Sequence, residues 1–429
     1  MPGPVFKLAP TTQQYDWGKV GRDSKVAQLA EASKISGFTL DETAPYAELW
    51  MGTHPKSPSL VLDTAKPLSE HLAAHPDLIG KTITQRFERD YGTSGGNLPF
   101  LFKVLSIHKA LSIQTHPDKA TAEELHRTQG DIYKDPNHKP EMALALTPFL
   151  ALCGFQPLPR IAANLKATPE AAALIPPNTL QTFLDISSSV DPTGPKEKNA
   201  LKALFEALMT AEAIPVRQQL NQVVARYKKG ELREGEQKDV VDLVLRLDTQ
   251  FPEDIGIFCA YVLNQVRLSP GEAIFLGAGE PHAYVEGDIM ECMANSDNVI
   301  RAGLTPKLRD IPNLISGLSY TAAPPSNHVV NPRPFGNDVG EPSSTLYDPP
   351  IPEFSVVQLA LPSGSTESHR AIDGPSIAVV TEGSGNIAWG TESLDVSTGD
   401  VFFVGAKQEI RFSASGEKMV AYRAFVETS

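Results

Sequence analysis

The chain has few cysteines, no long apolar run and no excess of positive charge, and each absence excludes a class of protein. Its 429 residues include three cysteines, Cys153, Cys259 and Cys292, which form no Cys-x-x-Cys pair. We therefore expect a reduced intracellular chain without a disulfide framework or a cysteine zinc site. No stretch approaches the roughly 20 apolar residues of a membrane helix. Residues 1–7 lack the basic start and apolar run of a signal peptide, so we expect a cytoplasmic protein.

The net charge limits the possible functions, and the turn-forming residues limit the possible folds. Lys and Arg number 38 against 51 Asp and Glu, which gives a net charge of −13. This average field repels nucleic acid and anionic membranes, so neither is an expected partner. A small anionic substrate would need a local basic pocket. The 36 prolines and 31 glycines have no Gly-X-Y period and favour many turns and short strands.

The pattern of apolar residues changes twice along the chain. The apolar run 98–107 and the alternating stretch 110–116 predict strands in the first third. Apolar residues at helical spacing follow between about 158 and 255, and strand patterns resume at 258. We therefore predict a mainly β fold with an α-helical insertion.

Three polar segments offer metal ligands. Gln114 and His116 share one face of a predicted strand, because alternate side chains point the same way. Glu141 and His282 would add a carboxylate and a second imidazole. Two nitrogen and two oxygen donors suit zinc, and also iron(II) or manganese(II). The simpler alternative is that Gln114 and His116 only bond a turn, since a motif match is a hypothesis.

Two segments, 271–278 and 399–406, share one pattern of glycine, apolar strand and second glycine, 128 residues apart. Such self-similarity predicts a duplicated β unit. The first copy continues to His282, whereas the same step in the second copy reaches Ile410. We therefore expect the second copy to have lost a metal ligand.

The segment 287–307 brings opposite charges together. Arg301 and Lys307 form a small basic centre, which suits a phosphate held by an arginine fork and a lysine charge. Glu291 and Asp297 are carboxylates of the same segment and suit proton transfer. Taken alone, the segment is better explained as a polar loop with solvated charges.

Longer motifs connect these segments. Residues 271–282 fit the second cupin signature, with Gly277 in place of a proline, and cupins are small jelly-roll barrels that hold a metal inside. A wider resemblance is carried by 14–18, 47–54, 112–118, 137–141 and 298–307. In this order the segments closely resemble the type I mannose-6-phosphate isomerases in their eukaryotic form, and the likeness covers essentially the whole chain.

The resemblance implies a fold and a domain division. The fold would be two cupin-like jelly-roll β domains plus a helical domain. Residues 1–155 together with 256–325 would form the catalytic cupin domain, and 156–255 the inserted helical domain. Residues 326–429 would form a linker and a C-terminal metal-free cupin-like domain.

The resemblance also implies an activity and its residues. The chain would interconvert mannose 6-phosphate and fructose 6-phosphate through an enediol, feeding GDP-mannose synthesis and protein glycosylation. One zinc ion per chain would be held by Gln114, His116, Glu141 and His282, with Arg301 as the active-site arginine. The other expected pocket residues are Lys139, Tyr284, Asp297, Lys307, Ser112, Glu291, Trp17 and Glu48. Glu291, Lys139 and a zinc-bound hydroxide are all candidates for the general base, and we favour Glu291. We expect a monomer.

Two other functions fit parts of the pattern. Two histidines and a carboxylate are also the ligands of mononuclear iron(II) dioxygenases, but Gln114 adds a ligand and such an enzyme has no need of Arg301 with Lys307. A non-catalytic bicupin that binds or stores sugars would not need acidic and basic side chains around one metal. The isomerase is the preferred hypothesis, with a sugar phosphate as the predicted partner.

Overall fold

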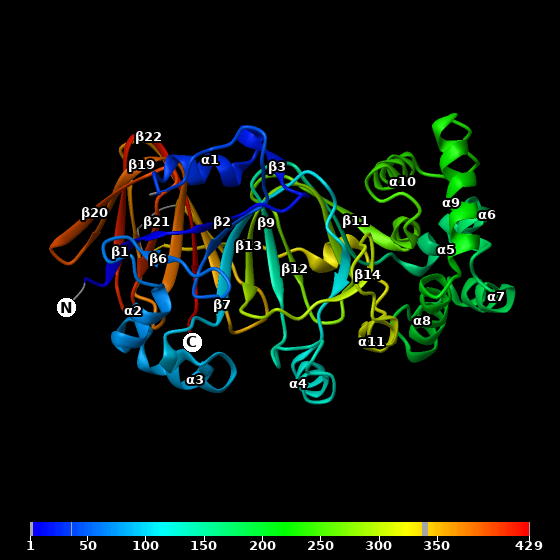
Figure 1. Ribbon diagram of the computed structural model, residues 1–429, viewed down its shortest axis with the longest axis horizontal. Helices are drawn as coiled ribbons and strands as arrows, with labels where there is room; N and C mark the ends of the chain where they lie inside the picture. The colour runs from blue at the N-terminus through cyan, green and yellow to red at the C-terminus, as the bar shows by residue number, and fades with distance from the viewer. Residues whose placement is uncertain (1–2, 36, 337–341, 429) are drawn as a thin grey trace.

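Two large antiparallel sheets and a helical domain lie in a row along the molecule (Figure 1). The computed structural model describes residues 3–35, 37–336 and 342–428, so residues 337–341 of the predicted linker lie outside the described part. The sheet built mostly from C-terminal strands occupies one end and the helical domain the other, with the second sheet between them. The predicted mainly β fold with a helical insertion is confirmed.

The central sheet has ten strands. Its main path runs through β11 (Leu263–Leu268), β10 (Phe149–Phe155), β13 (His282–Ala294), β7 (Phe100–Ile107), β5 (Glu48–Met51) and β2 (Thr11–Gln13). The strands off this path are β8 (Ile113–Thr115), β9 (Glu141–Ala145), β12 (Ala273–Leu276) and β14 (Ile300–Gly303). Every residue of β7 is buried, as the predicted strand at 98–107 requires, because both of its faces are covered.

The second sheet joins the two ends of the chain. Its strands are β15 (Arg333–Pro334), β16 (Ser344–Tyr347), β17 (Ser355–Leu361), β18 (Thr366–His369), β19 (Ser376–Trp389), β20 (Glu392–Ser397), β21 (Val401–Val404), β22 (Ile410–Phe425), β1 (Val5–Ala9) and β6 (Leu60–Val61). β1 pairs with β21 from Val5↔Val404 to Leu8↔Val401. Two strands of the predicted catalytic segment 1–155 therefore complete the C-terminal sheet, and the predicted domain division stays a prediction.

The two similar sequence segments form equivalent strands. β12 begins two residues after Gly271 and β21 two residues after Gly399, and both glycines have a positive φ, +88° and +91°. His282 is the first residue of β13, as Ile410 is of β22. The pattern of turn, strand and next strand thus recurs 128 residues apart, with imidazole replaced by an apolar side chain.

The helical domain is built from amphipathic helices that bury one face each. Its helices are α5 (Leu158–Ala167), α6 (Pro169–Ala172), α7 (Pro177–Ile186), α8 (Pro195–Met209), α9 (Ala213–Lys228) and α10 (Lys238–Gln250). Leu201, Leu204, Phe205 and Leu208 of α8 are buried in one core with residues of α9 and α10. The helical spacing in the sequence predicts this face.

The remaining elements lie around the sheets. They are α1 (Lys25–Ala32), α2 (Leu68–Ala74), α3 (Lys81–Tyr91), α4 (Lys119–Thr128), α11 (Ile311–Gly317), the short pair β3 (Lys19–Val20) and β4 (Pro45–Tyr46), and the 3-10 helices Gly21–Asp23, Pro76–Leu78, Thr93–Gly95, Ile255–Tyr261 and Pro325–His328. All three cysteines are buried and free. Within the described residues, no helix combines the length and apolar character needed to cross a membrane.

Candidate metal centre

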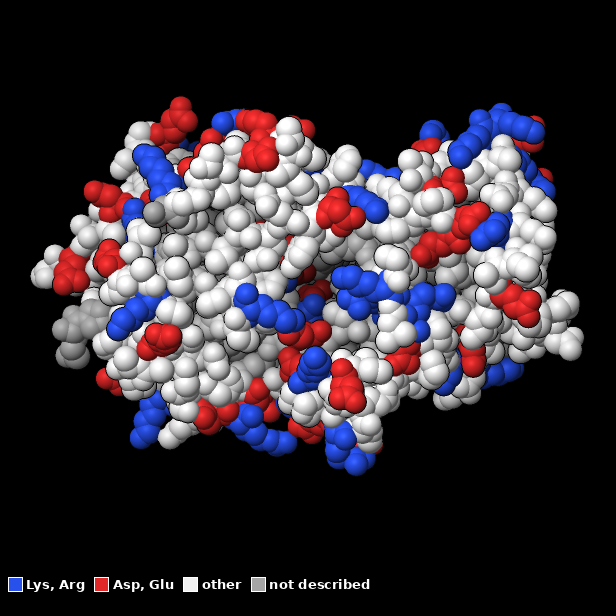
Figure 2. Space-filling model, in the orientation of Figure 1, with Lys and Arg blue, Asp and Glu red and all other residues white. Residues whose placement is uncertain are grey.

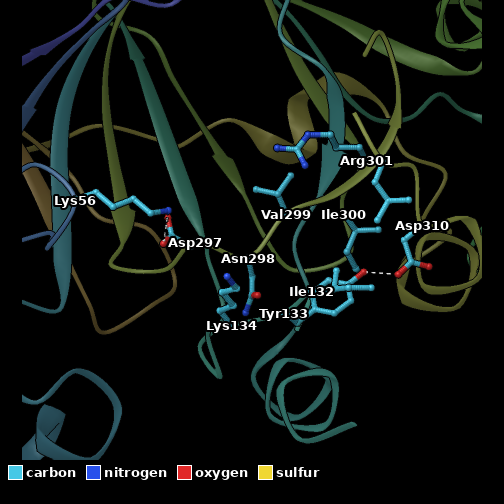
Figure 3. A pocket seen from close by; sticks show the side chains of 11 residues that line it. Lys56, Ile132, Tyr133, Lys134, Asp297, Asn298, Val299, Ile300, Arg301 and Asp310 are labelled. Atoms are coloured by element: carbon cyan, nitrogen blue, oxygen red, sulfur yellow. Dashed lines mark hydrogen bonds and ion pairs between the residues drawn. The ribbon is translucent and has the colours of Figure 1, made fainter. Parts of the chain in front are cut away.

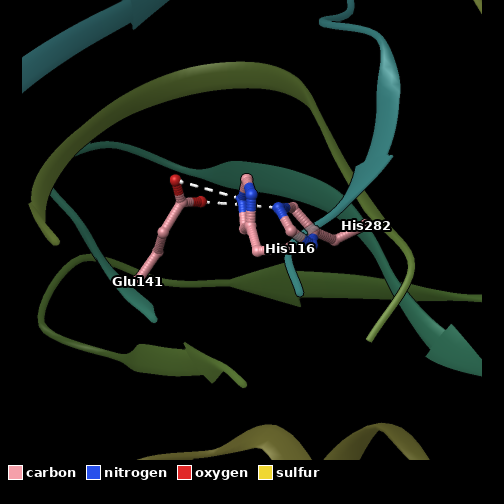
Figure 4. Close-up of side chains that lie close together, drawn as sticks. All are labelled: His116, Glu141 and His282. Atoms are coloured by element: carbon pink, nitrogen blue, oxygen red, sulfur yellow. Dashed lines mark ion pairs between the residues drawn. The ribbon is translucent and has the colours of Figure 1, made fainter. Parts of the chain in front are cut away.

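Three candidate ligands meet at strand ends of the central sheet (Figure 4). Glu141 begins β9, His282 begins β13, and His116 directly follows β8. Glu141 lies opposite Leu276 at the end of β12, and the chain turns from β12 into His282, which brings the two side chains to one place. The candidate ligand atoms all lie within 4.8 Å of one another, and all three side chains are buried.

Both imidazoles are oriented by backbone carbonyls. Nδ1 of His116 is 2.6 Å from the carbonyl oxygen of Asn298, and Nδ1 of His282 is 2.9 Å from that of Glu280. These contacts favour the tautomer with Nδ1 protonated, which leaves the Nε2 lone pair free. Both Nε2 atoms are buried without a hydrogen-bond partner. A metal ion bound between the two rings would give both nitrogen lone pairs a partner.

The carboxylate of Glu141 faces both free nitrogens. Its Oε1 is 3.3 Å from Nε2 of His116 and its Oε2 is 3.4 Å from Nε2 of His282. Burial lowers the pKa of His116 to about 4, so this ring is neutral at pH 7. Burial acts to raise the pKa of Glu141, but the positive charge of Lys139 holds it well below its usual range. Neutral imidazoles with an ionised carboxylate are the protonation states that bind zinc.

The fourth predicted ligand lies beside this group. Gln114 is the partner of His282 in the β8–β13 ladder and of Arg301 in the β8–β14 ladder. It is half-buried and lines a cavity of about 340 Å³. The backbone therefore places Gln114 next to His282 and at the edge of open space, where an amide oxygen could complete a four-donor shell.

A buried lysine that the sequence analysis missed lies in β7. Lys103 is 7% exposed, and its Nζ is 3.1 Å from Oε2 of Glu291 and 3.5 Å from Oε2 of Glu48. Burial acts to raise the pKa of Glu291 and Lys103 acts to lower it, and the pKa remains raised. The sequence feature that could have pointed to it is a single charged residue within the apolar run 98–107. A charge in a buried strand needs a partner of opposite charge nearby.

The cavity of about 340 Å³ holds much of the predicted pocket. Trp17, Glu48, Ser112, Gln114, Arg301 and Lys307 line it, and Lys109 and Phe251 extend its wall. On the face shown in Figure 2, Lys and Arg side chains surround a hollow near the middle, with acidic side chains inside it. A local basic site therefore exists in a chain of net charge −13, as an anionic substrate would require.

Arg301 also lines a second cavity, of about 250 Å³ (Figure 3). Asp297 lines the second cavity and pairs with Lys56, whose Nζ is 2.8 Å from Oδ2. His54 and Lys56 lower the pKa of Asp297, so it is an anion at neutral pH. Burial lowers the pKa of Arg301, but a guanidinium remains charged.

The other two predicted pocket residues contact the carboxylate of the candidate metal ligand. Nζ of Lys139 is 2.9 Å from Oε1 of Glu141, and the hydroxyl of Tyr284 donates to Oε2 of Glu141 over 3.5 Å. Burial raises the pKa of Tyr284, which keeps it a donor. The predicted site residues are thus gathered around the three ligands and two adjoining cavities, and the role of each residue stays a prediction.

Comparisons with known proteins cover all parts of the chain. The family description "Phosphomannose isomerase type I, catalytic domain" matches residues 5–158, the helical insertion domain of the same family matches 177–263, and its C-terminal part matches 344–392. The chain is 48% identical to the mannose-6-phosphate isomerase of Cryptococcus neoformans var. neoformans serotype D over 99% of each protein. It is 42% identical to that of Saccharomyces cerevisiae over 100% of each.

Solved structures give the same result. The apo form of mannose 6-phosphate isomerase from Salmonella typhimurium superposes with a TM-score of 0.80 at 29% identity, over 100% of both chains. A zinc-bound mannose 6-phosphate isomerase gives 0.80 at 29% identity, over 99% of this chain and 100% of that one. A form with zinc and yttrium gives 0.81 at 29% identity with the same coverage.

Proposed function

The chain belongs to the type I phosphomannose isomerase family, and from this premise we propose that it is a zinc enzyme that interconverts mannose 6-phosphate and fructose 6-phosphate. Enzymes of this family are isomerases, and the chain is one of them. One zinc ion per chain would be held by His116, Glu141, His282 and Gln114. The enzyme would act as a monomer in the cytosol and supply mannose 6-phosphate for GDP-mannose synthesis and protein glycosylation.

One observation carries the proposal above all others. Two buried imidazole nitrogens without partners face the two oxygens of a buried carboxylate. A cavity with Arg301 and Lys307 on its wall opens beside Gln114. A metal and a sugar phosphate would therefore occupy adjoining sites.

The chemistry divides between the metal and the side chains. A bound zinc would act as a Lewis acid at the sugar oxygens and stabilise the charge of an enediolate by several kcal/mol. Glu291 is our candidate for the base that moves the proton between neighbouring carbons, since burial raises its pKa toward the working pH. Lys103 orients Glu291, and Lys139 holds Glu141 ionised.

Arg301 and Lys307 would act on the anionic parts of the substrate. The Arg301 guanidinium can donate two parallel hydrogen bonds to phosphate or enediolate oxygens. Lys307 would add a second positive charge at the cavity wall. The phosphate is remote from the carbons that react, so binding it would fix the position of those carbons. This positioning lowers the activation barrier only if the bound geometry suits the transition state.

The test is an assay of purified protein for conversion of mannose 6-phosphate to fructose 6-phosphate, combined with elemental analysis. We expect activity with about one zinc per chain, and loss of both zinc and activity in His282→Ala. His75→Ala, at the end of α2, is the matched control and should retain both. Activity in metal-free protein would contradict the zinc mechanism, and activity restored only by iron(II) with oxygen uptake would favour a dioxygenase.

A further inference from the structure

A buried carboxylate of the C-terminal sheet contacts the loop that leads into the metal centre. Glu353 lies in the connection between β16 and β17 and is 4% exposed. Its Oε1 is 2.6 Å from Nε2 of His138 and accepts a hydrogen bond of 3.2 Å from the hydroxyl of Tyr91, at the end of α3. Its Oε2 is buried with no hydrogen-bond partner among the described residues. One carboxylate therefore connects the C-terminal sheet, α3 and residue 138.

Because Glu353 is buried, its contact with His138 restricts where His138 can lie. A buried carboxylate is costly unless its oxygens are bonded, and one oxygen of Glu353 already lacks a partner. Burial, and then the charge of Glu353, raise the pKa of Tyr91, so the phenol stays a donor. Moving His138 away would leave the first oxygen with Tyr91 alone.

The loop 134–140 has no helix or strand of its own, so such contacts decide where it lies. Asn137 is another anchor: its side-chain amide donates to the carbonyl of Asp90 over 2.7 Å, and its own carbonyl accepts from the amide of Asn298 over 2.7 Å. The backbone carbonyl of Asp135 also accepts from the amide of Asn298, so His138 carries the one contact of this loop that comes from Glu353. His138 follows Asn137 and directly precedes Lys139, whose Nζ is 2.9 Å from Glu141. The loop thus runs from these anchors directly to Lys139 and Glu141.

We propose that Glu353 is a positioning residue: by holding His138, it keeps Lys139 in place against Glu141. The C-terminal sheet, for which no metal is expected, would then contribute to catalysis through this one contact. The kinetic part of the proposal rests on the proposed isomerase activity. The placement of the loop does not depend on it.

The test compares two replacements of Glu353 in zinc-loaded, full-length protein. Glu353→Met has a similar length and no hydrogen-bond acceptor, whereas Glu353→Gln keeps an acceptor oxygen. We expect Glu353→Met to lower kcat by roughly tenfold with KM within about twofold, because small displacements of a catalytic group are costly. Amide hydrogen exchange in 134–140 should rise in the same variant. Glu353→Gln should restore most of both properties.

Two matched controls separate positioning from stability. Tyr91→Phe removes the other donor to Glu353 and leaves His138 bonded, so it should lower the melting temperature and leave kcat and loop exchange unchanged. Glu170→Met removes a carboxylate of the helical domain that is 5% exposed and bonded to Arg226. It too should cost stability without changing loop exchange.

His138→Ala completes a double-mutant cycle. It should reproduce Glu353→Met, and the double variant should be no worse than either single variant, because coupled residues are not additive. If Glu353→Met does not fold, His138→Ala decides the question, since its side chain is 23% exposed. Wild-type loop exchange in these variants would overturn the positioning role. Absence of isomerase activity in the wild type would contradict the proposed function, while the exchange data would still decide the positioning.

Discussion

Buried charges of opposite sign determine what single residues of the site can do. Lys103 lies between Glu291 and Glu48, both of which are almost fully buried. Without the lysine, two neighbouring buried carboxylates would lose their counter-charge, and such groups take up protons more readily. Lys103 therefore helps to set the fraction of Glu291 that is ionised, which matters for the role of base that we propose for Glu291.

Lys103→Met tests this control. Loss of the positive charge removes the contribution that lowers the pKa of Glu291, so the pKa should rise further. A base must be ionised to accept a proton, and the acid limb of the kcat/KM profile should therefore move to higher pH. The measurement is a pH–rate profile of the variant beside the wild type. An acid limb that does not move, in a variant that still folds and binds zinc, would exclude Glu291 as the base.

Arg301→Lys tests the guanidinium fork. The variant keeps the positive charge and loses the planar pair of donors, which is a severe change at a bidentate site. We expect kcat/KM to fall at least tenfold, about 1.4 kcal/mol, with zinc retained. A fall in kcat would assign Arg301 to the enediolate, and a rise in KM alone would assign it to the phosphate. If both constants match the wild type, the phosphate role passes to Lys307.

Some residues of the site could be predicted from the sequence and others could not. His116, Glu141 and His282 stand out because each lies in a motif with a recognisable spacing. Lys103 was missed because its run reads as an ordinary buried strand, and its partners lie 55 and 188 residues away. The contact between Glu353 and His138 spans 215 residues, and neither neighbourhood carries a motif that would pair them.

At the level of elements, one strand–turn–strand unit serves two purposes. β12 and β13 present His282 to the candidate metal centre, whereas β21 and β22 place Ile410 at the equivalent position. The partner of His282 in its ladder is Gln114, and the partner of Ile410 is His369. The sequence could predict these strands from local pattern. It could not predict that β1 pairs with β21, because strand pairing depends on contacts between residues nearly 400 positions apart.

Ile410→Ala tests whether the second unit is a packing element. Ile410 is 1% exposed in a core with Leu361, Phe402 and Phe412, so truncation should destabilise the protein by about 2–5 kcal/mol through lost burial and a cavity. The measurement is the shift of the unfolding transition together with elemental analysis. We expect zinc content to be unchanged. Loss of zinc from the folded variant would show that the C-terminal sheet takes part in metal binding.

For the whole molecule, the distribution of charge matters more than its sum. A doubly charged sugar phosphate would approach a chain of net charge −13, so the average field opposes binding. The cavity that we assign to the substrate is lined by three cations, Lys109, Arg301 and Lys307, and by two carboxylates, Asp16 and Glu48. These cations oppose the average field over a short range, since salt screens exposed charges beyond about 8–10 Å.

Removal of the metal tests the relation between the fold and the site. Two of the three ligands begin strands of a ten-stranded sheet and the third directly follows a strand of it, and this sheet has its own buried core. The framework should therefore persist without metal, unlike small domains that fold only around zinc.

We expect a chelator to abolish isomerase activity and leave the far-ultraviolet circular dichroism unchanged. The melting temperature should fall, because zinc that binds only the folded chain at 100 times its Kd stabilises it by about 2.7 kcal/mol. Added zinc should restore both activity and melting temperature. Loss of secondary structure on chelation would show instead that the metal is needed to hold the sheet together. In that case the free-energy cost of burying the unpartnered nitrogens of His116 and His282 would exceed the stabilisation from the hydrophobic core.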